Sequence, residues 1–260
     1  MSEDVEIPAD ITDESDIPQD HPRYEDLITR FRIERGVELG ITHLQGMHAE
    51  GRGSAFDYLL GERTIPSADR AERAAAAVLL LAEQPVISVN GNVAALVPGE
   101  VGSLATSVGA AVEINLFHRT EERLRAIEAH LQQHGITTVL GVDADERLPG
   151  LNHARSLVDS DGIFAADVVL VPLEDGDRAI ALGELGKTRI VIDLNPLTRS
   201  QQVAEFPIVD NVIRAIPNLT KHADFLRDES PETLESIIES FDPQAALDAA
   251  ERTIRSGRLD

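Results

Sequence analysis

The sequence predicts an α/β protein with a doubly wound, mostly parallel sheet and additional helices at the N- and C-terminal ends. Two observations support this fold class. Short apolar runs rich in β-branched residues alternate with helix-like segments from residue 86 to residue 209, as expected of parallel strands buried on both faces. The segments before and after this region carry the apolar spacing and capping residues of helices.

The stretch 166–200 is the clearest strand–helix–strand unit. Its apolar runs, Val168–Val171 and Arg189–Leu194, flank a helical segment from Arg178 to Gly186. Each run ends in a polar cluster. Because the carboxyl ends of parallel strands face the ligand crevice in open α/β sheets, we expect the chemistry of the protein at these two strand ends.

The other elements follow from similar signals. Apolar spacing predicts a helix from Tyr24 to about Gly40, and the glycines between Gly46 and Gly61 predict a turn that passes close to another group. Ser67 is expected to cap a helix over Ala68–Glu83. Strands are expected at Val86–Asn90, Val112–Leu116, Thr138–Gly141 and Pro207–Val209, and helices at Glu100–Val108, Thr120–His134 and Ala154–Val158 and after Ser230-Pro231 and Asp242-Pro243.

The first twenty residues differ in composition from the rest of the chain. Residues 1–20 contain many acidic residues, no basic residue and two prolines, which predicts a disordered acidic tail. No linker or internal repeat divides residues 21–260, so this part is expected to form a single domain. It is long enough to bury a core without disulfides.

The charge balance is strongly acidic, with 46 acidic against 23 basic residues and a net charge of -23. Such a surface makes nucleic acid and anionic membranes poor partners. The basic residues are almost all arginine, since Lys187 and Lys221 are the sole lysines. Salt screens the self-repulsion of so acidic a chain, so we interpret the composition as adaptation to the salt-rich cytoplasm of a halophilic archaeon. An ordinary acidic protein is the alternative.

The chain has no cysteine. Disulfides, thiol catalysis and cysteine-ligated metals are therefore excluded. The N-terminus has no apolar stretch of signal-peptide type, and no run has the length of a membrane span. We expect a soluble cytoplasmic protein.

Two common nucleotide signatures are incomplete. Gly186-Lys187-Thr188 resembles the end of a P-loop, but Ala181 stands where the first glycine is needed, and a helix precedes instead of a strand. Gly51-x-Gly53 begins like a dinucleotide fingerprint, but Phe56 occupies the third glycine position. A standard NAD site is not expected.

The first polar cluster contains Glu174, Asp175 and Asp177. Carboxylates at this density suit Mg²⁺ held together with substrate phosphates. A solvated turn with an aspartate that caps the next helix explains the same residues equally well.

The second polar cluster is Asp193-Leu194-Asn195, followed by Arg199 and, at the next strand end, by Asp210-Asn211. A phosphorylated ligand that approaches so acidic a chain needs local guanidinium groups, which bind phosphate in a bidentate manner. The candidates are Arg30, Arg52 and Arg199. Of these, Arg52 lies between two glycines that let a ligand approach, whereas an ordinary surface ion pair accounts for Arg30 at least as well.

Asn90 and Asn92 flank Gly91 after a predicted strand, where they either bind substrate or form a turn. Three histidines have a chemistry suited to proton transfer, although a structural role is the default for each because no partner is visible in the sequence: His21, His118 and His153.

Several segments taken together resemble the archaeal 4-phosphopantoate–β-alanine ligase family, also called archaeal phosphopantothenate synthetase. The resemblance runs in the family's order from His21 onward. The family has a histidine before the glycine turn where this chain has Glu50. The segments that carry the resemblance are His21-Pro22-Arg23-Tyr24, Gly51-Arg52-Gly53 with Ala55–Leu59, Val86–Asn92, Asn115–Thr120, Val171–Arg178 and Asp193–Leu197.

The resemblance implies a Rossmann-like fold, a homodimer and an ATP-dependent ligase of coenzyme A biosynthesis. Such an enzyme joins 4-phosphopantoate to β-alanine and releases AMP and diphosphate. It implies ATP contacts from Arg30, Arg52, Asp193, Leu194, Asn195, Arg199, Ser200, Asn211 and Val212. Our hypothesis adds Arg52, Asp175 and Asp177 as catalytic residues, Asn90, Asn92 and Glu174 as substrate contacts, and Mg²⁺ as a cofactor without assigned ligands. A nucleotide-binding sensor and, more remotely, an NAD-linked oxidoreductase are the rival functions.

Overall fold

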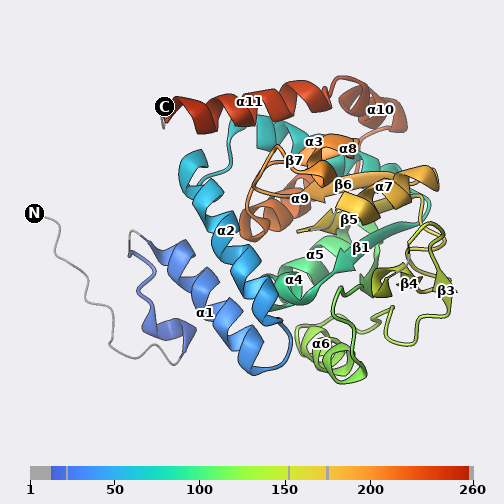
Figure 1. The fold of residues 1–260 in the computed structure, drawn as a ribbon. Coiled ribbons are helices and arrows are strands. Elements are labelled where there is room, and N and C mark those ends of the chain that lie inside the picture. The colour runs from blue at the N-terminus through green and yellow to red at the C-terminus, as the bar shows by residue number, and fades with distance from the viewer. Residues whose placement is uncertain (1–12, 22, 152, 174–175, 258–260) are drawn as a thin grey trace, which may run out of the picture.

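The computed structural model describes residues 13–21, 23–151, 153–173 and 176–257. Its centre is a parallel sheet of five strands in the order β2-β1-β5-β6-β7 (Figure 1). Leu140 adds one parallel bridge to the outer edge of β2. With this bridge as the third strand, the spatial order in chain numbering is 3-2-1-4-5-6, which is the order of the Rossmann fold. The strands are β1 (Pro85–Val89), β2 (Ala111–Ile114), β5 (Val168–Pro172), β6 (Thr188–Ile192) and β7 (Phe206–Ile208).

The strands are buried on both faces, as the continuous apolar runs predicted. Alternate residues of β5 belong to different cores, because successive side chains of a strand point to opposite faces. Val168 and Leu170 pack in the larger core, which includes side chains of α3 (Pro66–Leu81), α5 (Pro98–Val108) and α9 (Val212–Leu226). Val169 and Val171 pack in a second core with Leu182 of α7 (Gly176–Glu184). Helices therefore cover both faces, and the predicted doubly wound class is confirmed.

The N-terminal part differs from its prediction in two respects. Residues 13–20 lie against the domain: Glu14, in the short 3₁₀ helix Glu14–Asp16, forms an ion pair with Arg32, and Ile17 is buried. The predicted disorder is therefore wrong for residues 13–20, because the Glu14 carboxylate finds a partner on the helix α1 (Tyr24–Glu38) and the apolar side chain of Ile17 is buried. Residues 1–12, the rest of the predicted tail, lie outside the described residues.

The glycine-rich segment is a helix, α2 (Leu44–Leu60), and the predicted turn is wrong. His43 caps its N-terminus, and Gly61 ends it in the left-handed conformation. Gly46 lies in the helix at a point where a side chain would overlap with Asn92. The prediction that the glycines allow a close approach of another group is therefore correct at Gly46. Packing against neighbouring elements outweighs the low intrinsic helix propensity of glycine.

Smaller differences lie at element ends. The helix α3 is capped at Ile65 with Pro66 in its first turn, not at Ser67, and residues 138–141 supply a single bridge instead of a strand. The segment 154–158 forms a 3₁₀ helix, η2 (Ala154–Ser156), followed by β4 (Leu157–Val158), which pairs antiparallel with β3 (Glu146–Arg147). The helices α4 (Gly91–Leu96) and α8 (Arg199–Val203) escaped prediction because they are short, whereas Thr120 caps α6 (Glu121–Gln133) as expected.

The C-terminal helices α10 (Pro231–Glu239) and α11 (Pro243–Ser256) begin at the predicted caps, Ser230 and Asp242. They lie on the side of the molecule opposite α6 (Figure 1). Leu247 and Ala250 of α11 pack with Leu60 and Leu194, so α11 lies against the end of α2 and the loop after β6. Within the described part of the chain, no helix has both the length and the apolar character needed to span a membrane.

Candidate functional site

A pocket of about 400 Å³ opens at the carboxyl ends of the parallel strands. Its volume is in the range of small-molecule sites. The pocket spans the point between β1 and β5 where the strand order reverses, the usual ligand position in such sheets. Its lining includes seven of the predicted site residues, Arg52, Asn90, Asn92, Asp193, Leu194, Asn195 and Asn211, and further His43, Gln45, Gly46, Ala49, Glu50, Gly53, Phe56, Gly91, Leu116, Phe117, His118, Arg123, Arg155, Leu173 and Thr198.

One end of the pocket is formed by the loop after β6. Asp193 accepts a hydrogen bond from the backbone N–H of Asn195 at 2.9 Å, and Asn195 accepts one from Leu197 at 3.0 Å. These bonds fix a tight turn that leads to Thr198, the N-cap of α8. Burial raises the pKa of Asp193, while its bond to Asn195, Thr198 and the nearby Arg52 guanidinium act in the opposite direction. Arg52 reaches this end from α2.

Asn211 lies beside this end as the N-cap of α9, where its Oδ1 accepts from the backbone of Ile213 at 3.2 Å. Its Nδ2 donates to Asp57 of α2 at 2.8 Å. Asp57 in turn pairs with Arg214 at 2.5 Å, and Arg214 also pairs with Asp210 at 2.7 Å. The wall between α2 and α9 is thus held by a buried network of ion pairs.

The middle of the pocket is held together by two asparagines. Asn90 caps α4, and its Nδ2 donates to the carbonyl oxygens of Pro172 and Leu173 at 3.1 Å. This contact joins the ends of β1 and β5 across the switch point. Asn92 donates from Nδ2 to the carbonyl oxygen of Gly46 at 2.9 Å, which fixes α2 over the sheet. Both asparagines therefore have a structural role at the pocket floor.

Glu50 lines the pocket from α2 and is buried. Burial raises the pKa of Glu50 to about 7, although its interaction with the Asn92 side chain lowers it. Its carboxyl group therefore changes charge near neutral pH. Sequence reasoning noted this residue only as a departure from the family.

The opposite end of the pocket lies beyond β2 and was not predicted as a group. His118 stacks on His43 with ring centroids 4.2 Å apart and bonds to Gln45 at 2.6 Å. Arg123 of α6 and Arg155 of η2 complete this end. His118 follows the strand β2, so its place at a strand end could have predicted its position in the pocket. Arg155 lies in the segment 145–165, where the sequence pattern gave the weakest indication of secondary structure.

The remaining predicted residues lie outside the lining. Arg30 is exposed on α1 and pairs with Asp26 at 3.0 Å, which is the ordinary surface ion pair that the sequence offered as the alternative. Asp177 pairs with Arg199 at 2.6 Å, and both side chains are more than half exposed. Ser200 and Val212 are buried in the first turns of α8 and α9. Glu174 and Asp175 lie outside the described residues.

The other two candidate histidines are structural. His21 accepts a hydrogen bond from the backbone of Arg23 at 3.0 Å, and His153 accepts one from Arg155 at 3.3 Å as the cap of η2. Neither lines the pocket.

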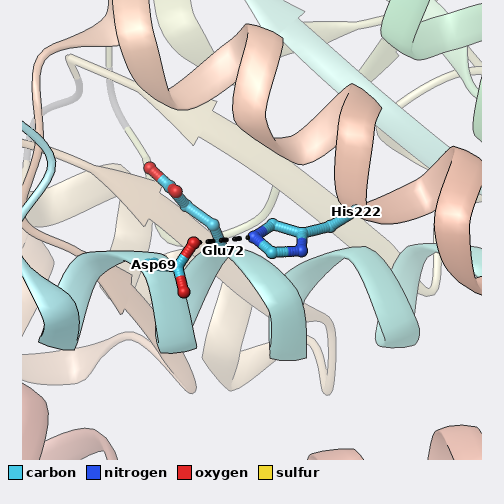
Figure 2. A group of neighbouring side chains, drawn as sticks. All are labelled: Asp69, Glu72 and His222. Carbon is cyan, nitrogen blue, oxygen red and sulfur yellow. Dashed lines mark hydrogen bonds and ion pairs between the residues drawn. The ribbon is translucent and has the colours of Figure 1, made fainter.

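A second group of titratable side chains lies between α3 and α9 and combines Asp69, Glu72 and His222 (Figure 2). Figure 2 shows the His222 ring beside the Asp69 carboxylate, and Nε2 of His222 lies within hydrogen-bond distance of that carboxylate, at 3.1 Å. Glu72 is fully buried. Burial, and next the negative charge of Asp210, raise the pKa of Glu72 far above its usual range. It carries a proton at neutral pH, which disfavours it as a metal ligand.

The fold and the pocket define a Rossmann-like α/β protein with a small-molecule site at its switch point. A family model described as phosphopantothenate/pantothenate synthetase matches residues 67–257. The 4-phosphopantoate–β-alanine ligase of Methanosarcina mazei is 54% identical over 236 residues, which cover 91% of this chain and 93% of that protein. The enzymes of the same name from Thermococcus kodakarensis and Methanospirillum hungatei are 53% and 55% identical over 87% and 79% of this chain, and 87% and 84% of theirs. The chain belongs to the phosphopantothenate/pantothenate synthetase family.

Proposed function

We propose that this chain is an ATP-dependent 4-phosphopantoate–β-alanine ligase of coenzyme A biosynthesis. The observation that carries the proposal is 54% identity over 91% of the chain to an enzyme of that name. The pocket at the switch point supplies a site of suitable size for the substrates. A sensor protein without activity and an NAD-linked oxidoreductase are the weaker alternative functions, because the relatives are named as ligases.

The reaction proceeds in two balanced steps. A carboxylate oxygen of 4-phosphopantoate attacks the α-phosphorus of ATP, the bond from that phosphorus to the bridging oxygen breaks, and diphosphate leaves with the bond's electron pair. The amine of β-alanine then attacks the acyl carbon, AMP leaves, and the amine loses a proton. Such chemistry depends on positioning and on stabilisation of phosphate charge, so no nucleophilic side chain is required.

The pocket end around Asp193 fits the nucleotide. Asp193 and Asn195 are held by local backbone bonds, and Arg52 brings a guanidinium beside them. We propose that Arg52 binds ATP phosphates and that Asp193, Leu194, Asn195 and Asn211 contact the nucleotide. Arg199, Ser200 and Val212 flank this end at the starts of α8 and α9. We assign Arg30 no contact with ATP bound to the same chain, because Arg30 lies on the exposed face of α1.

Mg²⁺ would accompany the ATP phosphates and neutralise part of their charge. Among the described lining residues, the carboxylates are Glu50 and Asp193. Hard oxygen ligands of this kind suit Mg²⁺, and a bound cation favours the ionised form of a carboxyl group whose pKa is raised by burial. Asp177, together with Glu174 and Asp175, is an alternative source of ligands. Full activity of the Ala variants at all three positions would remove that alternative.

One assay tests the function. The protein is given ATP, Mg²⁺, 4-phosphopantoate and β-alanine in molar KCl, and nucleotide products are separated. We expect AMP that depends on both substrates. Formation of ADP indicates phosphoryl transfer instead, and no turnover favours a sensor.

Arg52→Ala tests the nucleotide site. We expect the KM for ATP to rise by on the order of ten-fold or more, because a charge-assisted contact to phosphate is lost. Arg35→Ala is the matched control, since Arg35 is an exposed arginine of α1 paired with Glu38. An unchanged ATP dependence of Arg52→Ala refutes the assignment.

We further propose that the enzyme is a cytoplasmic homodimer. Large apolar side chains are exposed on α2, among them Leu44, Met47, Tyr58 and Leu59. Large exposed apolar side chains are candidates for an association surface. Light scattering coupled to size exclusion tests the dimer, and Tyr58→Glu is expected to shift the mass to that of one chain.

A further inference from the structure

Glu113 is a fully buried acid within the central sheet. It belongs to β2, where its neighbours Val112 and Ile114 pack in the larger apolar core. Because successive residues of a strand point to opposite faces, Glu113 points to the second face of the sheet. Burying a carboxyl group costs free energy unless it is paired or hydrogen-bonded. Glu113 does not line the switch-point pocket, so its presence requires another explanation.

An irregular segment, residues 153–163, covers the second face of the sheet beside β2, where Ile163 packs in the second core. Oε1 of Glu113 accepts a hydrogen bond from the backbone N–H of Asp159 at 3.3 Å, and Oε2 accepts one from Ile163 at 2.6 Å. A Cβ atom on Gly162 would overlap with Oε2, so a glycine is needed for this close approach. The carboxyl group of Glu113 thus holds the second half of the segment.

Asn115 holds the first half of the same segment. Its backbone N–H donates to the carbonyl oxygen of Val89 at 2.9 Å, which continues the pairing of β2 with β1. Asn115 therefore points to the same face as Glu113, two positions earlier. Its Nδ2 donates to the carbonyl oxygens of Arg155 at 3.2 Å and Leu157 at 3.1 Å. Two side chains of one strand thus bind the segment, one through its N–H groups and the other through its carbonyl groups.

The segment carries Arg155 to the switch-point pocket. Arg155 is buried, lines that pocket and places its guanidinium over the Phe117 ring, 5.6 Å from the centroid. Its backbone carbonyl is one of the two that Asn115 binds. The position of the guanidinium in the pocket wall therefore depends on how the segment is seated on β2.

The protonation state of Glu113 affects this seat. Four charged groups face its carboxyl group: Asp159, Arg119, Arg178 and Lys187. Burial raises the pKa of Glu113 to about 7, although the bond from Ile163 and the charge of Arg178 lower it. When the segment lifts, the carboxyl group regains water and an ordinary pKa of about 4.3. The closed segment therefore favours the protonated acid, and opening becomes easier as pH rises from about 4.3 to 7.

We propose that Glu113 is a positioning residue for the ligase reaction, which holds the segment 153–163, and through it Arg155, in the pocket wall and holds it less firmly once ionised. Glu113 acts only through the segment, because it does not line the pocket. The effect on the reaction rests on the ligase function proposed above, whereas the hold on the segment does not.

Hydrogen exchange of the backbone amides of residues 153–163 tests the hold directly. At constant KCl we expect their protection in the parent protein, corrected for the intrinsic exchange rate, to fall by on the order of ten-fold from about pH 5 to pH 8. Glu113→Gln stays neutral, so its protection should not change over this range and should exceed that of the parent at pH 8. Constant protection in the parent overturns the proposal, even if Glu113→Gln fails to fold.

Asp145→Asn is the matched control. Asp145 is a second carboxylate that holds this segment, since it accepts from the backbone N–H and the hydroxyl of Ser160, both at 2.8 Å. These two bonds lower the pKa of Asp145, so it is ionised throughout the range. The variant should lose protection by a similar factor at each pH and keep the pH dependence of the parent. If that dependence disappears in Asp145→Asn as well, it does not originate at Glu113.

Kinetics separates positioning from a purely structural role. The ratio of kcat/KM for the non-nucleotide substrates, Glu113→Gln over parent, should be near one at about pH 6 and rise several-fold by pH 8. Ionisation of the substrates affects both proteins alike and cancels in this ratio. The KM for ATP should be equal in both, because the proposed nucleotide contacts lie at the β6 end.

The failures of the two proposals are distinguishable. A ratio that does not change with pH, together with pH-dependent protection, would show that the segment loosens without effect on the reaction, and the positioning role would be overturned. A parent enzyme that forms no AMP with both substrates would contradict the ligase function, and with it the effect on the reaction, whereas the exchange result stands independently.

Discussion

Asn211 donates a hydrogen bond from Nδ2 to Oδ2 of Asp57 at 2.8 Å, across 154 positions of the chain. The bond joins the cap of α9 to the middle of α2, and both residues are buried. Arg214 contacts the same carboxylate at 2.5 and 3.2 Å. The shape of the pocket at the β6 and β7 end therefore depends on a carboxylate that does not itself line it.

Asp57→Ala is expected to destabilise the protein by on the order of 3 kcal/mol, because it leaves a buried guanidinium with fewer acceptors and Asn211 without its partner. Activity should fall as well, since Asn211 can then turn into the pocket. Chemical denaturation measures the change. The control is Glu38→Ala, which breaks an exposed pair with Arg35 and should cost less than about 1 kcal/mol. Similar losses in both variants would contradict the role of the buried network.

Gly46→Ala should impair activity more than stability. The new Cβ would overlap with Oδ1 of Asn92, so the Asn92 side chain must leave its position on the pocket floor. Gly51→Ala in the same helix meets no atom within 4 Å and should raise stability by about 0.5–1 kcal/mol. Steady-state kinetics and thermal melts of the two variants separate the effects. Normal kinetics for Gly46→Ala would show that Asn92 is not needed in this position.

Glu72→Gln should stabilise the protein, and by more at higher pH. The folded chain keeps a proton on Glu72 that the unfolded chain releases above the ordinary glutamate pKa of about 4.3. Folding at neutral pH therefore takes up a proton, and the free energy of unfolding falls as pH rises above that value. The neutral amide removes this dependence.

Denaturation of Glu72→Gln and the parent protein at constant KCl, from about pH 5 to pH 8, measures this trend. The difference between them should grow with pH. Glu235→Gln, at an exposed position of α10, controls for the loss of one negative charge. A constant difference over this range would show that Glu72 is ionised in the folded protein.

Arg199→Ala should leave stability nearly unchanged, because its ion pair with Asp177 is exposed. If Arg199 binds the nucleotide, as the family resemblance implies, the KM for ATP rises by on the order of ten-fold. Asp177→Ala removes the same ion pair and is the control. A rise of similar size in both variants would mean that the ion pair or a magnesium ligand at Asp177, and not a contact of Arg199 with ATP, is what matters.

The acidic composition predicts a dependence on salt. Between about 0.1 and 1 M salt the Debye length falls from roughly 10 to 3 Å, so repulsion within a chain of net charge -23 is progressively screened. We expect the melting temperature to rise steadily with KCl over this range. An equal melting temperature at low salt would argue against a halophilic source and favour an ordinary acidic protein.

Much of the fold was predictable because its signals are local. The buried runs at Val168–Val171 and Arg189–Leu194, and the caps at Thr120, Ser230 and Asp242, are properties of adjacent residues. The same holds for the polar cluster at Asp193–Asn195, because any residue just after a parallel strand faces the crevice.

The errors arose where neighbours distant in sequence decide the structure. The glycines of α2 disfavour a helix by intrinsic propensity, but contacts with α1 and α4 and the close approach of Asn92 stabilise one. Residues 13–20 are acidic and poor in apolar groups, yet the ion pair of Glu14 with Arg32 and a buried position for Ile17 hold them to the domain. Neither effect has a signature within the segment itself.

The sequence by itself determined the doubly wound class, the strand ends that carry the site and the family resemblance, because each depends on short-range pattern. Only the tertiary structure decided that Arg30 lies on an exposed face of α1, that Arg199 pairs with Asp177, and that Arg123 and Arg155 converge with His118 on one end of the pocket. Such convergence depends on how α6 and η2 are placed around β2. That placement is set by packing of the whole core and not by the residues next to each arginine.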